Sequence, residues 1–168
     1  MGYSIGNRVS QQLRRVELNE FGDFILINTG DASFTKRFSE LIKWMDGKNE
    51  ELNKIAAEMG EKYKDSPMIH TDEEGNTEVD TEQFSLYIKV KTDLYTECSN
   101  KIDALFGQDT LRKYFRAFYE INPDFIPDEE CIMDFLEEIS PVLETIYNER
   151  FQQINQKYNK NRKGSRGK

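Results

Sequence analysis

The residues best suited to carry chemistry are few, and they lie apart in the sequence. The chain has one histidine, His70, and two cysteines, Cys98 and Cys131. It lacks a glycine-rich phosphate loop, a Cys-x-x-Cys pair, a His-Glu-x-x-His motif and a serine placed as in a nucleophile elbow. The 31 acidic residues are so numerous that no single carboxylate pair indicates acid–base catalysis. We therefore predict a binding protein that is not an enzyme and has no cofactor.

One acidic run, residues 72–74, invites comparison with a metal site. A calcium-binding loop of the EF-hand type needs acids at alternate positions before its glycine and a glutamate near its end. The three acids here are consecutive and Gly75 follows them directly. We interpret residues 65–78 as a solvated loop without a metal, and His70 within it as a surface residue.

The most informative stretch runs from Cys98 to Tyr119 and is rich in aromatic residues. Gly107 follows Phe106 at a point where a helix can end in a left-handed residue. Asp109 or Thr110 can then cap a second, short helix. Phe106 and the rings that follow it belong either to the core or to a groove for a partner, because aromatic residues dominate binding hot spots.

Composition favours one helical domain inside the cell. The chain has 168 residues, 37% of them hydrophobic, and a mean hydropathy of −0.76. Twenty aromatic residues offset this modest apolar content, because each ring buries a large area. No apolar run approaches the roughly 20 residues of a membrane span, and no signal-peptide core is present. We expect a cytoplasmic protein with no membrane contact and with buried thiols rather than a disulfide.

A β-hairpin is expected near the N-terminus, over about residues 13–28. Val16 and Leu18 alternate with polar residues, and the run Phe24–Ile27 is rich in strand-forming residues. Gly22 lies in the turn between them. The unbroken apolar run 24–27 suggests that both faces of the second strand are buried, one of them under a helix.

The rest of the chain shows apolar residues at helical spacing. Helices are predicted over residues 33–64, 80–106, 110–118 and 127–158. Gly47 leaves open whether the first is one kinked helix or two, and Pro141 either kinks or splits the last. The predicted fold is mainly α, a single helical domain over residues 1–158 with an N-terminal hairpin packed on it and a long C-terminal helix.

Charge is distributed unevenly along the chain. Residues 157–168 hold six basic residues and no acid, whereas the other 156 residues hold 17 basic and 31 acidic residues. The body should repel nucleic acid, so we do not expect a nucleic-acid partner. Residues 159–168 read as a flexible basic tail, in which Arg162, Lys163 and Arg166 can meet an acidic partner.

The last predicted helix is too long for a compact domain. Residues 127–158 would span roughly 45 Å at 1.5 Å per residue. Its end should project, pair with a second copy, or meet a partner helix. We predict self-association of the isolated protein through this end, and a partner-binding surface made by Tyr114, Phe118, Tyr119, Tyr147, Phe151, Ile154 and Tyr158.

Three segments carry a family resemblance. NKIDALFGQDTLRKYF at Asn100–Phe115, NEFGDFILINTGDASFTKRFSELI at Asn19–Ile42 and KYNKNRKGSRGK at Lys157–Lys168 cover about half the chain. Their order and motifs resemble those of tail assembly chaperones from phages and prophages of Gram-positive bacteria. A second Phe-Gly often follows the short helix in that family, whereas Arg116 follows Phe115 here.

The resemblance implies a cytoplasmic, non-enzymatic protein of the bacterial host cell. It would bind the tape-measure protein or another tail protein, keep the partner's helices from aggregating, and leave before the tail matures. The alternative is a small structural or nucleic-acid-associated phage protein that makes its contact through the basic C-terminal tail.

Overall fold

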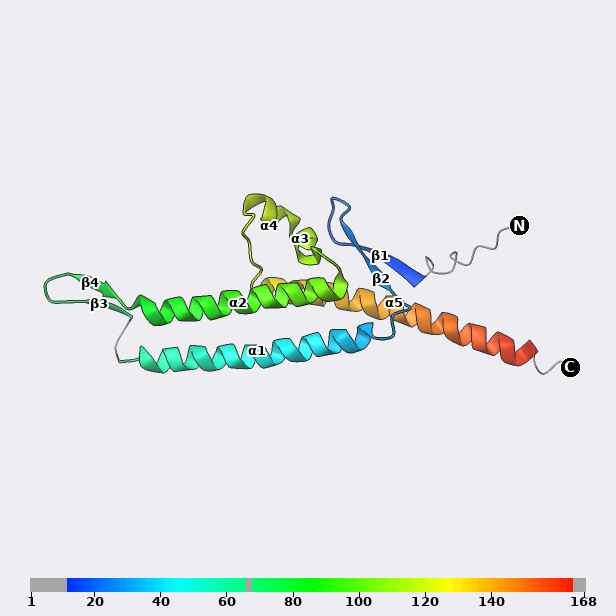
Figure 1. Ribbon diagram of the computed structural model, residues 1–168, viewed down its shortest axis with the longest axis horizontal. Helices are drawn as coiled ribbons and strands as arrows, with labels where there is room; N and C mark the ends of the chain where they lie inside the picture. The colour runs from blue at the N-terminus through cyan, green and yellow to red at the C-terminus, as the bar shows by residue number, and fades with distance from the viewer. Residues whose placement is uncertain (1–11, 66–67, 165–168) are drawn as a thin grey trace.

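The structure, a computed structural model, describes residues 12–65 and 68–164, and it is mostly helical (Figure 1). An N-terminal antiparallel hairpin precedes the helices and a long helix ends the described chain, which confirms the predicted fold class. In order, the elements are β1 (Leu13–Glu17), β2 (Phe24–Asn28), α1 (Phe34–Lys62), β3 (Ile69–Thr71), β4 (Thr77–Val79), α2 (Thr81–Phe106), α3 (Thr110–Tyr114), α4 (Arg116–Ile121) and α5 (Glu129–Gly164).

Three long helices form the frame of the molecule. α1 and α2 run antiparallel along most of their length (Figure 1). α5 packs against the second half of α2, where Phe135 contacts Phe106, and then projects beyond it. α1 is a single helix that passes through Gly47, and α5 is a single helix that contains Pro141. Residues 34–62 therefore form one helix, since a lone glycine costs a helix only about 1 kcal/mol. α5 is also one helix, although a proline inside a helix costs about 3 kcal/mol.

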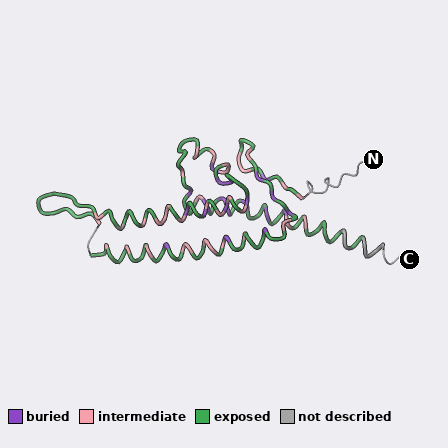
Figure 2. The backbone as a smooth tube through the Cα atoms, viewed as in Figure 1, coloured by how far each residue is buried: buried purple, intermediate pink, exposed green. Residues whose placement is uncertain are grey.

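The core sits where the hairpin, α3 and the three long helices meet (Figure 2). Phe106, at the end of α2, lies at its centre. Its ring makes edge-to-face contacts with Phe34 and Phe38 of α1, at centroid distances of 5.7 and 6.1 Å. It makes a third with Phe135 of α5, at 5.5 Å. Phe106 is buried, so it belongs to the core and not to an exposed groove.

The N-terminal hairpin is buried on one face only. Val16 pairs with Ile25, and both point into the core with Ile27. Phe24 and Leu26 point the other way, and Leu26 is 50% exposed. The expectation that both faces of the run 24–27 are buried is wrong, because these two strands form a sheet of their own and the rest of the fold covers only its inner side.

Residues 65–78 were predicted to form a loop. The structure instead has two short paired strands in this region, β3 and β4. The Asp72 carboxylate organises the turn between them. Its Oδ1 accepts the backbone N–H groups of Glu74 and Asn76 at 2.9 and 2.8 Å. Gly75 takes the positive φ of 82° that the turn requires. The first acid of the run therefore stabilises a turn through backbone hydrogen bonds, and this turn joins the two strands of a short hairpin.

The predicted short aromatic helix is divided at Phe115 into α3 and α4. Neither Asp109 nor Thr110 caps α3 through its side chain. The Asp103 carboxylate of α2 accepts the Leu111 N–H at 3.3 Å instead, and the Thr110 hydroxyl donates to the Gly107 carbonyl at 2.6 Å. The start of α3 is thus fixed from the preceding helix.

Replacing Phe106 by alanine should destabilise the fold by roughly 3–5 kcal/mol, as truncation of a core ring does. The loss arises because three helices lose a shared contact at once. Urea unfolding followed by circular dichroism measures the change. Phe151→Ala, at an exposed ring, is the control and should change stability by no more than about 0.5 kcal/mol. A loss below about 1 kcal/mol for Phe106→Ala would contradict the central role of this ring.

Candidate partner-binding surfaces

The single histidine and the two cysteines do not form a reactive cluster. His70 is exposed on β3, as predicted. Cys98 is buried, and burial raises the pKa of its thiol to about 11, so the group is neutral at physiological pH. Cys98 and Cys131 are both free thiols. Within the described residues, no group of three or more histidine, cysteine or acidic side chains is arranged to hold a metal ion.

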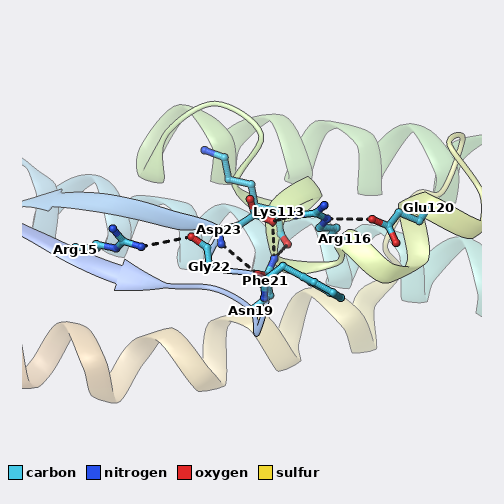
Figure 3. A network of polar contacts seen from close by, with 8 residues as sticks. All are labelled: Arg15, Asn19, Phe21, Gly22, Asp23, Lys113, Arg116 and Glu120. Atoms are coloured by element: carbon cyan, nitrogen blue, oxygen red, sulfur yellow. Dashed lines mark hydrogen bonds and ion pairs between the residues drawn. The ribbon is translucent and has the colours of Figure 1, made fainter.

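The turn of the first hairpin is tied to α3 and α4 by a polar network (Figure 3). The Asn19 side-chain amide donates to the Lys113 carbonyl at 2.7 Å and to the Asp23 carboxylate at 2.8 Å. The Asn19 side-chain oxygen accepts the backbone N–H of Phe21 at 2.9 Å. One asparagine thus folds its own turn and fastens that turn to a segment 94 residues later in the chain.

Arg116 adds an ionic link to the same network. Its guanidinium lies 3.2 Å from the Asp23 carboxylate and 3.0 Å from that of Glu120, and it covers the Phe21 ring at 4.9 Å. The Asn19 amide, helped by Arg116, holds the pKa of Asp23 below its usual range. This network fixes the hairpin and α4 relative to each other, so the aromatic residues between them share one rigid support.

Tyr114, Phe118 and Tyr119, predicted to bind a partner, lie in a cluster of rings on α3 and α4. Tyr114 packs edge-to-face on Phe135 at 5.2 Å, and its pKa rises to about 12 through burial and the nearby Glu138 carboxylate. Tyr119 is half-buried against Phe125 at 5.2 Å. Phe118 is the exposed member of the three. The cluster therefore presents mainly the Phe118 ring to solvent.

The other predicted binding residues lie along α5. Tyr147 stacks on Phe34 at 5.9 Å, and among the described residues its buried hydroxyl has no hydrogen-bond partner. Phe151 and Ile154 follow beyond the body of the fold and are 64% and 36% exposed. Tyr158 is on the same helix, but its side chain lies outside the described residues.

The structure does not bring the seven predicted residues into one surface. Tyr114 contacts α5 at Phe135, whereas Tyr147 lies 12 residues further along, roughly 18 Å at 1.5 Å per residue. Two separate exposed regions result: the Phe118 side of α4, and the free end of α5, which we define as residues 148–164.

The basic segment continues this free end. α5 runs through Gly164, so the first six residues of the predicted tail have helical backbone. Arg162 and Lys163 lie on this last part of α5, with side chains outside the described residues. Arg166 lies beyond the described chain altogether.

Other exposed apolar residues were not predicted as binding residues. Phe84 and Ile88 on α2 share the spacing of a core face, and Leu86 lies on the other side of the same helix. Ile121 ends α4 and is also exposed. Helical spacing alone could not reveal this exposure, because it identifies a shared face but not whether another element covers that face.

Comparison with known proteins finds no matching family model, no matching curated protein and no matching solved structure. Across the described residues, no helix combines the length and the apolar character needed to cross a membrane.

Removing Asn159–Lys168 should leave the fold intact. The segment contains no apolar residue, so it can bury little hydrophobic area. We expect the melting temperature of the truncated chain, measured at low protein concentration, to fall by no more than about 2 °C. A decrease of many degrees would show that the segment packs on the body.

Asp23→Asn should weaken the fold in a pH-dependent way. Because the pKa of Asp23 is lowered in the folded state, its charged form stabilises the fold above the unfolded pKa near 3.8. This contribution is lost as pH falls through the lowered folded value. The urea midpoint of the variant should lie below that of the wild type at neutral pH, and the gap should close below about pH 3.8.

Asp124→Asn, at an exposed position in the link before α5, is the matched control for that measurement. Its difference from the wild type should be small at every pH. A gap for Asp23→Asn that stays constant down to acid pH would mean that the shape of the side chain matters and its charge does not.

Proposed function

We propose that this chain is a cytoplasmic tail assembly chaperone of a phage or prophage, and that it binds the tape-measure protein through an apolar helical surface. The observation that carries the proposal is the free end of α5. Phe151 and Ile154 are exposed there, beyond Tyr147, which packs on the body through Phe34. An amphipathic partner helix can pack on such a stripe, since the i and i+3 positions of a helix lie on one side.

The amide side chains around this stripe favour a partner that is apolar on one side and polar on the other. Gln152 and Asn155, whose side chains are amides, lie next to Phe151 on the helix, whereas Gln153 and Gln156 lie on its opposite side. Amides form hydrogen bonds with either donors or acceptors, so they tolerate many partner sequences. A chaperone that holds successive segments of a long helical protein needs this kind of tolerance, because its client presents many related faces.

The exposed ring of Phe118 offers a second contact on the same molecule. It is supported by a stacked contact with Phe115 at 5.7 Å and an edge contact with Phe125 at 5.3 Å. A ring held in place by its neighbours loses little conformational freedom on binding. The two separated surfaces suit an extended helical client better than a compact one, because such a client offers more than one segment to bind.

The test is coexpression of the tagged chain with the tape-measure protein of the phage or prophage that encodes it. The wild type should hold that protein in the soluble fraction and copurify with it. Phe151→Glu combined with Ile154→Glu should lower recovery about tenfold or more, because the substitutions bury charge against the partner. Copurified DNA or RNA in place of a tail protein would support the nucleic-acid alternative instead.

A matched control uses the opposite side of the same helix. Gln153→Glu with Gln156→Glu adds the same charge at the same spacing, on exposed polar positions. This variant should copurify with the tape-measure protein as the wild type does. Equal losses for the two double variants would show that charge near the free end, and not the apolar stripe, controls binding.

A further inference from the structure

One face of α2 is continuous along the whole helix although its surroundings change. Phe84 and Ile102 are 18 residues apart, which is five turns at 3.6 residues per turn, so they share one angular position. Ile88, Lys91, Tyr95 and Cys98 fall within about 40° of the same direction. We call these six positions the α2 seam.

α5 covers only the second half of the α2 seam. Ile102 and Cys98 are 0% and 3% exposed, whereas Phe84 and Ile88 are 44% and 43% exposed. The α2 seam passes from exposed to buried where α5 begins. The start of α5 lies beside the middle of α1, since Glu129 accepts a hydrogen bond from Asn49 at 2.8 Å. A three-helix arrangement thus gives way to a two-helix one near the middle of α1 and α2 (Figure 1).

The two-helix part together with the β3–β4 hairpin at its tip, residues 50–65 and 68–94, is named the arm. It is held together between α1 and α2, since Leu52 is buried and the Tyr63 hydroxyl donates to Asp80 at 3.1 Å. Lys62 lies 3.6 Å from the same carboxylate. The two helices of the arm are therefore packed on each other while the α2 seam beside them is exposed. Within the described chain, no third helix covers this part of the seam.

The charges of the arm and of the free end of α5 are opposite. The arm has 12 acidic and five basic residues, a net charge of −7, of which −5 lies in residues 63–65 and 68–80 at its tip and −2 on the two helices. The free end has five basic residues and one acidic residue, a net charge of +4. The lengths also agree, since 17 residues of α5 span about 26 Å and the 14 residues of α2 on the arm span about 21 Å.

We propose that the free end of α5 from a second copy docks on the α2 seam of the arm and takes the position of the third helix. Phe151 and Ile154 of one copy would then cover Phe84 and Ile88 of the next. The contact joins two different surfaces, so every copy carries one donor end and one receptor arm. The inference goes beyond the proposed function, because it concerns this chain alone and its test needs no tail protein.

The test measures mass in solution for the full chain and two single variants. By analytical ultracentrifugation, the wild type should self-associate with rising concentration, and added salt should weaken the association because the partners are oppositely charged. Ile88→Glu damages the arm and Phe151→Glu damages the free end. Each variant alone should remain monomeric at concentrations where the wild type associates.

Mixing the two variants gives the decisive result. The intact free end of the Ile88→Glu chain can still dock on the intact arm of the Phe151→Glu chain, so the mixture should form a complex of one copy of each. A mixture that stays monomeric would overturn the proposal. So would a strictly monomeric wild type, or an Ile88→Glu chain that associates as the wild type does, which would point to pairing between two α5 ends.

Leu86→Glu supplies the matched control on α2. Leu86 is exposed and lies about 200° around the helix from Phe84, away from the α2 seam. Its substitution should leave self-association unchanged, and circular dichroism should show equal helix content for all variants. If Leu86→Glu abolished association as fully as Ile88→Glu, charge on α2 in general would be responsible and the docking site would be wrong.

Discussion

The packing of the Phe106 ring is the contact on which the rest of this structure depends. It lies at the end of α2 and touches α1 through Phe34 and Phe38 and α5 through Phe135. Edge-to-face ring contacts of this kind contribute roughly 0.5–1.5 kcal/mol each beyond the area they bury. One residue thus joins three helices in the core, and each helix extends away from this junction by its own length.

That arrangement explains why the molecule has uncovered ends. A chain that is 37% hydrophobic can supply one dense core, and it places that core around the junction. α1 and α2 extend past the start of α5 in one direction, and α5 extends past Tyr147 in the other. In each projecting part, the helix face that is buried within the core continues as an apolar face, but no neighbouring helix covers it there. Exposed residues such as Ile88 and Phe151 are therefore continuations of core faces.

The helices were largely predictable from the sequence, whereas the exposure of residues such as Ile88 was not, and both outcomes have the same physical reason. Spacing of apolar residues identifies a helix and its buried side, which is how α1, α2 and α5 were anticipated from local sequence. It carries no information on where a distant element stops. Ile88 and Cys98 have equivalent spacing, and only the start of α5 leaves one exposed and buries the other. The exposure of Phe151 was predictable, because a helix this long must extend beyond the core that it packs on. The packing of Tyr147 was not, because it depends on Phe34, 113 residues earlier in the chain.

The two proposals place different ligands on one surface, and this has a quantitative consequence. If the free end of α5 docks on a neighbouring copy, only the undocked fraction can receive a partner helix, and the apparent affinity for that helix falls in proportion. With nine ends in ten engaged, the loss is about tenfold, or about 1.4 kcal/mol. A client that presents many helical segments can overcome this through multivalency, whereas a single stray helix cannot. Self-association would then act as a filter that favours long helical clients over isolated amphipathic segments.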